Sequence, residues 1–198
     1  MKKVAYFHPA LRVLHWLMAA AILSMLFIGV AMVSTVSSLH GLLVSIHKPL
    51  GVMILMLVIV RLWLRFTTAT PSLPDSIPVW QRLIAHLSHL VLYVMMLAQP
   101  LIGWAMLSAA GNSVTLGNGI VLPPIVPVDN DWYAILRPLH TWVAFALFAT
   151  VLLHLAAALL HAFILRDGVF NSMTGIRNTR LTLGTSRDRQ ASHRRYRA

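Results

Sequence analysis

Four stretches of the sequence are long and apolar enough to cross a lipid bilayer, and they restrict what the chain can fold into. They cover approximately residues 11–33, 43–64, 83–107 and 139–165, and a membrane-spanning helix needs about 20 apolar residues. Hydrophobic residues make up 58% of the 198 residues and charged residues only 11%, which excludes an ordinary soluble domain. The sequence therefore predicts an all-α fold, an integral membrane bundle of four transmembrane helices.

The first apolar stretch is longer than the core of a cleavable signal peptide. Lys2 and Lys3 precede it, as in a signal peptide, but signal cores typically have only about 7 to 15 residues. We therefore expect this stretch to be retained as the first transmembrane helix. Residues 1–168 are expected to form one transmembrane domain, and residues 169–198 a basic cytoplasmic tail.

Basic residues are distributed unevenly between the two sides of the predicted bundle. All but two of the 16 lysines and arginines precede the first span, flank the connection between the second and third spans, or follow the fourth span; the exceptions are Lys48 and Arg137. Because cytoplasmic segments carry the excess of basic residues, both termini are expected on the cytoplasmic side. Contact with anionic membrane lipid explains the net charge of +11 better than nucleic-acid binding does, since the charges cluster beside the spans and in the tail.

Four histidines occupy matched depths in the predicted spans. His140 and His154 are 14 residues apart in the fourth span, so they share a helix face and lie roughly 21 Å apart along the axis. His47 opens the second span at the outer side, and His15 lies early in the first span at the cytoplasmic side. The outer pair is therefore His47 with His140, and the inner pair His15 with His154. Such pairs are suited to bind two haems as axial ligands, and the absence of cysteine makes any haem non-covalent b-type.

Histidines in membrane spans can also have roles other than haem ligation. A single histidine near a helix end is more often an interfacial residue than a ligand, and only the joint pattern favours haem. Metal transport would favour carboxylate or thiolate ligands, but all five acidic residues lie in predicted loops or the tail. The same distribution argues against a proton pump that uses intramembrane carboxylates. The roles of His86 and His89, near the start of the third span, are left open.

Several cations near the helix ends are candidates to pair with haem propionates, because buried carboxylates need charge-assisted partners. Arg12, Arg61 and Arg65 are placed for an inner haem, and Lys48 or Arg137 for an outer one. The alternative is that these side chains only anchor the helix ends.

Short motifs along the chain resemble the bacterial di-haem cytochrome b561 family, a group of four-span b-type cytochromes of the inner membrane. The similarity runs from Leu11 to about Gly168, through LRVLHWL, SIHKPLG, RLWLR, AHLSHLVLY, PLHTWVA and HLAAALLH. The resemblance implies a bacterial inner-membrane location, with His15 and His154 as ligands of the inner haem and His47 and His140 as ligands of the outer one. These ligand pairs are the same as the pairs inferred above from the depths of the histidines in the spans.

The resemblance also implies a function as a quinone-linked electron carrier in respiratory electron transport. One activity in the family is superoxide oxidation at the outer face with reduction of ubiquinone near the cytoplasmic face, served by a histidine that matches His161 and by a lysine between the second and third spans. This chain keeps His161 but has Ser76 at the lysine position, which leaves Arg82 or His86 to bind the quinone.

Three function classes remain after this comparison. The first is a free-standing carrier between an outer-face donor and quinone, whose enzymatic activity, if it has one, is superoxide:quinone oxidoreduction. The second is the cytochrome b subunit of a hydrogenase or formate dehydrogenase type of complex, which would receive electrons from an iron-sulfur or c-type partner. The third is a structural or transport protein without haem.

Overall fold

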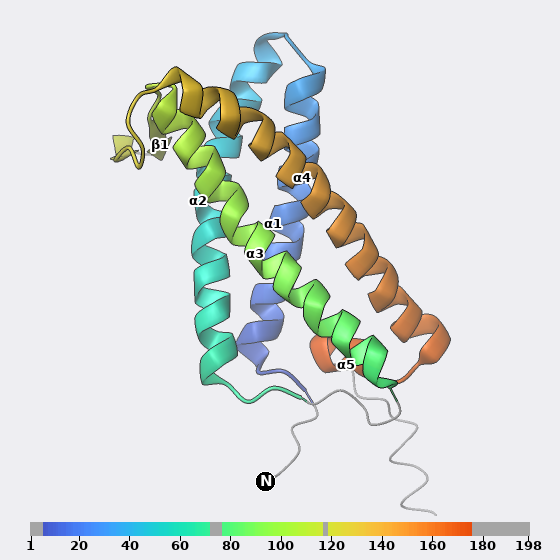
Figure 1. Ribbon diagram of the computed structural model, residues 1–198. Helices are drawn as coiled ribbons and strands as arrows, with labels where there is room; N and C mark the ends of the chain where they lie inside the picture. Colours follow the sequence, from blue (N-terminus) through green and yellow to red (C-terminus); the bar gives the residue numbers. More distant parts are fainter. Residues whose placement is uncertain (1–5, 72–76, 117–118, 176–198) are drawn as a thin grey trace, which may run out of the picture.

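The structure is a computed structural model, and it describes residues 6–71, 77–116 and 119–175. Four long helices dominate it (Figure 1). All four are long and apolar enough to cross a membrane, so the predicted all-α membrane bundle is confirmed. The elements in chain order are α1 (Pro9–Ser34), α2 (Ser38–Thr67), α3 (Val79–Ala109), β1 (Val114–Leu116), β2 (Ile120–Leu122), α4 (Asn130–Leu159), the π-helical turn η2 (Leu160–Leu165) and α5 (Val169–Thr174).

The helices form two antiparallel pairs. The most extensive contacts are between α3 and α4 and between α1 and α2, and α2 also packs on α3. In Figure 1 the α3–α4 pair is inclined across the α1–α2 pair. We call the end with the start of α1, the end of α2 and the start of α3 the basic end, at the bottom of Figure 1, and the opposite end, with β1, the hairpin end.

The interior is small, and most large apolar side chains point outward. One buried cluster joins the middle of α1 and α2 through Leu14, Met18, Ala21, Ile22, Ile54 and Val58. By contrast, Phe27 and Trp63 are 68% and 64% exposed. In a protein whose helices span a bilayer, such side chains face lipid rather than water. The core therefore fixes the helix pairs, while the outer surface fits the membrane.

Helix α4 begins at Asn130, nine residues before the fourth predicted span, residues 139–165. Residues 108–138 separate the third and fourth predicted spans, but residues 108 and 109 still belong to α3, and the chain is helical again from Asn130 onward. The Asp129 carboxylate accepts hydrogen bonds from the backbone N–H groups of Asp131 and Trp132, at 2.8 and 3.1 Å, which is a typical helix N-cap. Pro138 lies inside the helix.

A short hairpin covers the hairpin end of the bundle. Strands β1 and β2 are antiparallel, with Val114 opposite Leu122, and Val114 is 4% exposed where β1 contacts α2. The indole N–H of Trp104 donates to the Pro123 carbonyl at 3.0 Å. The apolar hairpin thus packs on the helices.

The segment after α4 folds back at the basic end. The short helix α5 follows η2, and the Phe7 N–H donates to the Ser172 carbonyl at 3.1 Å. The first part of the predicted tail is therefore folded against the start of the chain. Residues 176–198, Ser76, Lys2 and Lys3 lie outside the described residues.

Candidate functional site

Two histidine pairs lie one above the other along α4. At the basic end, the ring centres of His15 on α1 and His154 on α4 are 6.4 Å apart. At the hairpin end, those of His47 on α2 and His140 on α4 are 6.2 Å apart. Each pair connects one helix of the α1–α2 unit to α4, and the structure brings together the histidines that depth had paired.

The ring separations match two imidazoles that share one metal ion. A metal ion bonds an imidazole nitrogen at about 2.0 Å, and that nitrogen lies about 1.1 Å from the ring centre, so two opposed imidazoles have centres roughly 6.2 Å apart. Edge-to-face ring packing covers the same range of centre-to-centre distances, and the rings of both pairs are inclined to each other, by 73° and 68°. The separation recurs at both ends of α4, and at each end it is compatible with one metal ion shared by the two rings.

The remaining ligands of such an ion would not come from protein side chains. Within residues 6–71, 77–116 and 119–175, no group of three or more His, Cys, Asp or Glu side chains is arranged to hold a metal ion. Two axial imidazoles without further side-chain ligands fit a metal held in a macrocycle, as in haem. They do not fit a four-coordinate zinc site.

The backbone of α3 leaves space for the ring of His140. A Cβ atom added at Gly103 would lie 3.0 Å from Cε1 and 3.3 Å from Nδ1 of His140, closer than ordinary van der Waals contact. The side-chain amide of Gln99, one turn earlier on α3, donates to the His140 carbonyl at 2.9 Å. Helix α3 therefore positions His140 by a close approach and by a hydrogen bond.

Several polar atoms around the hairpin-end pair are buried without partners. Within the described part of the chain, Nδ1 of His47, Nδ1 of His140 and Oε1 of Gln99 have no hydrogen-bond partner and no accessible surface. Buried polar atoms are normally satisfied, and an unpaired one needs an explanation. A bound group that contacts Nδ1 of these rings would supply it for the imidazoles.

The basic-end pair includes a third histidine that sequence reasoning left open. The ring centre of His89 on α3 is 5.5 Å from that of His154. His86 and His89 are both exposed residues. The ring contact with His154 is what places His89 beside the basic-end pair.

Arg61 ties three helices together beside this pair. Its Nε donates to the Tyr93 hydroxyl on α3 at 3.1 Å, and its Nη1 donates to the Leu11 carbonyl on α1 at 2.9 Å. The side chain is partly buried, so its charge lies in a medium of lower dielectric constant than water. Arg61 thus has a structural role in addition to the charge that it places near the histidines.

Arg12 and Arg65 carry unpaired buried nitrogens at the basic end. Among the described residues, Nε of Arg12 and Nη1 of Arg65 have no partner and no accessible surface, while the Arg65 guanidinium lies 5.5 Å from the ring centre of Phe7. Burying a cation without a counter-charge is costly. The basic end is therefore suited to bind an anionic group close to His15 and His154.

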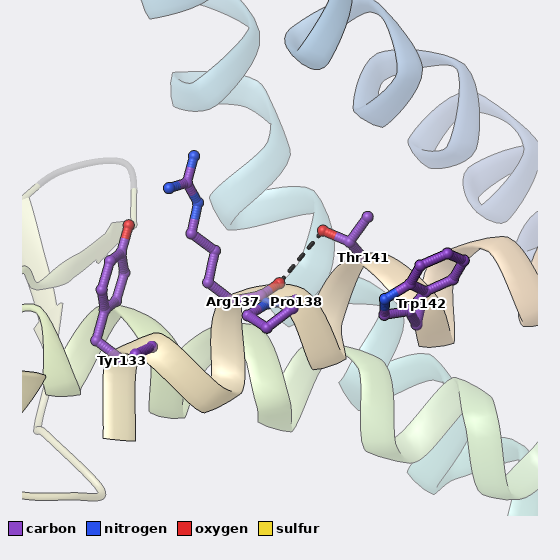
Figure 2. Close-up of a pocket in the computed structure, with 6 residues that line it drawn as sticks. Tyr133, Arg137, Pro138, Thr141 and Trp142 are labelled. Carbon is purple, nitrogen blue, oxygen red and sulfur yellow. Dashed lines mark hydrogen bonds between the residues drawn. The ribbon is translucent and has the colours of Figure 1, made fainter. Parts of the chain in front are cut away.

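A shallow cavity of about 560 Å³ lies at the hairpin end, at the start of α4. Figure 2 shows Tyr133, Arg137 and Thr141 along one stretch of α4, with the Thr141 hydroxyl donating to the Arg137 carbonyl at 3.2 Å. Because Pro138 has no N–H, it cannot donate to the Ala134 carbonyl, which belongs to the same cavity. Arg137 is exposed, whereas Lys48 on α2 is half-buried.

His161, in the π-helical turn, is hydrogen-bonded to an acidic residue. Its Nδ1 lies 2.6 Å from Oδ2 of Asp167. Arg82, at the start of α3, donates from Nε to the Ile77 carbonyl at 2.9 Å. His161 and Arg82 both lie at the basic end.

Sequence reasoning missed three residues of these sites. His89 shares a helix stripe with Tyr93, Met96 and Gly103, at successive steps of four, three and seven residues, and this stripe was the signal that it lies on the same face of α3 as those residues. Gln99 is an isolated polar residue in an apolar span, which is a signal in itself. Asp167 carried no signal, because its contact with His161 depends on a non-helical chain path.

The chain is similar to proteins of one family over most of its length. The family model described as prokaryotic cytochrome b561 matches residues 6–175. This match covers all four long helices and both histidine pairs.

Curated relatives support the same grouping. The chain is 30% identical to "Cytochrome b561 homolog 1" of Escherichia coli (strain K12) over 138 residues, 69% of this chain and 77% of that protein. It is 32% identical to "Probable superoxide oxidase CybB" of Yersinia pestis over 129 residues, 65% and 72% of the two chains. "Cytochrome b561 homolog 2" of Escherichia coli (strain K12) is 27% identical over 164 residues, 81% and 87% of the two chains.

Proposed function

Because the chain belongs to the prokaryotic cytochrome b561 family, a family of haem b proteins of the bacterial membrane, we propose that it holds two haems b and carries single electrons across the bilayer to a quinone. The observation that carries this proposal is the repeated ring separation, 6.4 Å for His15 and His154 and 6.2 Å for His47 and His140. When bound, haem b supplies a one-electron Fe(III)/Fe(II) couple.

Each haem would be held by two histidines from different helices. His15 and His154 bind the haem at the basic end, and His47 and His140 bind the one at the hairpin end. Because each pair connects α4 to α1 or α2, haem binding also stabilises the contact between the two helix pairs. Arg12, Arg65 and Arg61 are the partners for the propionates at the basic end, and Lys48 or Arg137 for those at the hairpin end. Cations that neutralise the propionates would stabilise the Fe(II) state of the haem relative to the Fe(III) state.

The orientation follows from the charges. The basic end carries the excess of arginines and is the cytoplasmic end in this proposal, so the hairpin end faces the outer side. Residues 1–168 form the transmembrane domain, and residues 169–198 a basic cytoplasmic segment next to anionic lipid. Electrons then move between an outer-face donor and the basic end.

The quinone is placed at the basic end, at His161. The ring is partly buried and lies seven residues beyond His154 in the chain, close to the surface where a lipid-soluble quinone can enter from the bilayer. Arg82 and His86, at the start of α3, are the further candidates to hydrogen-bond its carbonyl oxygens.

Replacing His161 by alanine is expected to reduce quinone reduction by about 100-fold, the size of effect typical of a lost proton donor. The haem spectrum should remain that of the wild type, since His161 is not a proposed ligand. The measurement is stopped-flow reoxidation of the dithionite-reduced protein by a short-chain ubiquinone in detergent micelles.

His40→Ala is the control for this experiment, because His40 lies at the hairpin end and contacts the Met32 carbonyl. An unchanged quinone rate in His161→Ala with full haem content would remove the quinone site from His161. If quinone does not oxidise the reduced haems of the wild-type protein, the proposed quinone function is wrong.

Superoxide:quinone oxidoreduction is the second candidate. It is favoured by the relative named "Probable superoxide oxidase CybB" and by the cavity at the hairpin end, where Arg137 offers a cation to a small anionic donor. Reduction of the haems by enzymatically generated superoxide, compared with reduction in the presence of superoxide dismutase, tests it directly.

A further inference from the structure

We propose that Asp167 is a positioning residue that orients His161 to deliver a proton to the quinone. This inference rests on the proposed function, and it concerns a residue that neither the family resemblance nor the spacing of the histidines assigns. The carboxylate oxygen Oδ2 of Asp167 lies 2.6 Å from Nδ1 of His161. The two side chains are 15% and 21% exposed, respectively.

The contact exists because the chain leaves the α-helical path between these residues. In a regular α-helix, a residue six positions later lies about 120° away around the axis, on a different face. Here, Leu160–Leu165 forms a π-helical turn, and Arg166 has a left-handed backbone with φ of 49°. Single π-turns occur often at functional sites, and a left-handed non-glycine residue is uncommon.

Gly168 contributes to the change of chain direction that follows η2. Its φ of 84° is in the left-handed region, which glycine adopts at little cost. The chain thereby turns back so that the Asp167 side chain reaches His161 in the preceding turn. The π-turn and the left-handed backbone at Arg166 and Gly168 together bring Asp167 into contact with His161.

The Asp167 carboxylate is fixed from its other side as well. Its Oδ1 accepts a hydrogen bond from the Val169 N–H at 3.1 Å. The following helix α5 is held to the start of the chain by the hydrogen bond from Phe7 to Ser172. The carboxylate therefore has both oxygens engaged, and it holds the imidazole in one orientation.

This arrangement determines which nitrogen of His161 is available. An ionised carboxylate can only accept hydrogen bonds, so Nδ1 of His161 is the donor and carries a proton. Nε2 is then the nitrogen that binds and releases a second proton. The carboxylate fixes the orientation of the ring through its Nδ1, as a second residue does behind many functional histidines.

Reduction of a quinone to a quinol needs two electrons and two protons. Haem b held by the two histidine pairs would supply the electrons, one at a time. For each proton, the Nε2–H bond of His161 breaks as an O–H bond forms at a quinone carbonyl oxygen. Cytoplasmic water then returns a proton to Nε2, and Nδ1 keeps its proton and its bond to Asp167 throughout.

The test is the D167N variant of the full-length haem-loaded protein in detergent micelles. Asparagine keeps an oxygen for the Val169 N–H but removes the negative charge. With a short-chain ubiquinone as probe, and rates expressed per reduced haem at the basic end, we expect kcat to fall by about tenfold or more with KM within about twofold of the wild type. D167E restores the carboxylate, and its kcat should recover to within about threefold of the wild type.

A double-mutant cycle with H161Q separates this role from a general effect on structure. If Asp167 acts only through His161, D167N lowers kcat no further in the H161Q background. The control is D131N, the same change at the opposite end of α4, which should leave kcat unchanged.

The outcomes distinguish this inference from the proposed function. Equal kcat in D167N and wild type, with H161Q impaired, would overturn the role of Asp167 and leave the quinone site in place. A further tenfold loss by D167N in the H161Q background would also overturn it. If quinone does not oxidise the reduced wild-type protein, the proposed function itself is wrong.

Discussion

Replacing His154 by alanine is expected to remove one of the two haems and to stop electron transfer through the protein. His154 is one of two imidazoles at the basic end, with its ring centre 6.4 Å from that of His15, and a haem that loses an axial histidine in an apolar site loses most of its binding energy. The haem content should fall to about half of the wild-type value. Haem extraction and a reduced-minus-oxidised spectrum of the purified protein measure both effects.

The complementary variant is His140→Ala, which should remove the haem at the hairpin end and leave the other. The two variants should therefore lose spectrally different components. His40→Ala serves as the control and should keep both haems. If His154→Ala retained the full haem content, the axial role of His154 would be wrong, and His89, whose ring centre is 5.5 Å away, would be the first substitute ligand to examine.

Replacing Gly103 by valine is expected to remove the haem at the hairpin end without touching either histidine. Even a Cβ at this position would lie 3.0 Å from the His140 ring, and the two methyl groups of valine extend further into the space of the ring. Because both residues lie in packed helices, the imidazole has to move out of line with His47. We expect the haem content to fall to about half, with loss of the same spectral component as in His140→Ala. Haem extraction and the reduced-minus-oxidised spectrum measure both effects in this variant as well.

Gly41→Val is the matched control, because a Cβ at Gly41 meets nothing within 4 Å. It makes the same change of residue on α2 and should leave both haems in place. Gly103→Ala should give an intermediate effect, since the ring needs to shift by only a few tenths of an ångström. Full haem binding by Gly103→Val would show that the close approach of α3 does not position His140.

The four helices could be predicted because the bilayer requires long apolar segments. Their ends could not be predicted to the same extent. The start of α4 is polar, with Asp129 as N-cap and Pro138 inside the helix, so hydropathy alone did not include this part in the fourth span. A hydropathy pattern reports where the membrane is, whereas capping hydrogen bonds determine where the helix begins.

The pairing of the histidines could be predicted because antiparallel helices bring equal depths together. His15 and His154 share one depth, and His47 and His140 another, and the structure brings the ring centres of each pair to 6.4 and 6.2 Å. Their ligation of iron stays a prediction. The sequence left His89 open because depth alone does not say which face of α3 is turned toward His154 on α4.

The contact between His161 and Asp167 lay beyond sequence reasoning. Helical periodicity places these residues on different faces, and their contact needs the π-turn of η2 and the left-handed backbone at Arg166 and Gly168. Such local departures from regular geometry are poorly encoded in composition. They are also where functional pairs are often found.

The central claim is that two haems b lie between two histidine pairs of one chain. The most direct test is the ratio of extracted haem to protein in the purified wild-type chain, with the redox difference spectrum recorded on the same sample. The account predicts about two haems per chain, both b-type and bis-histidine, since each of the two pairs holds one. A folded protein that contains no haem, or one haem that survives replacement of either His140 or His154, would contradict it.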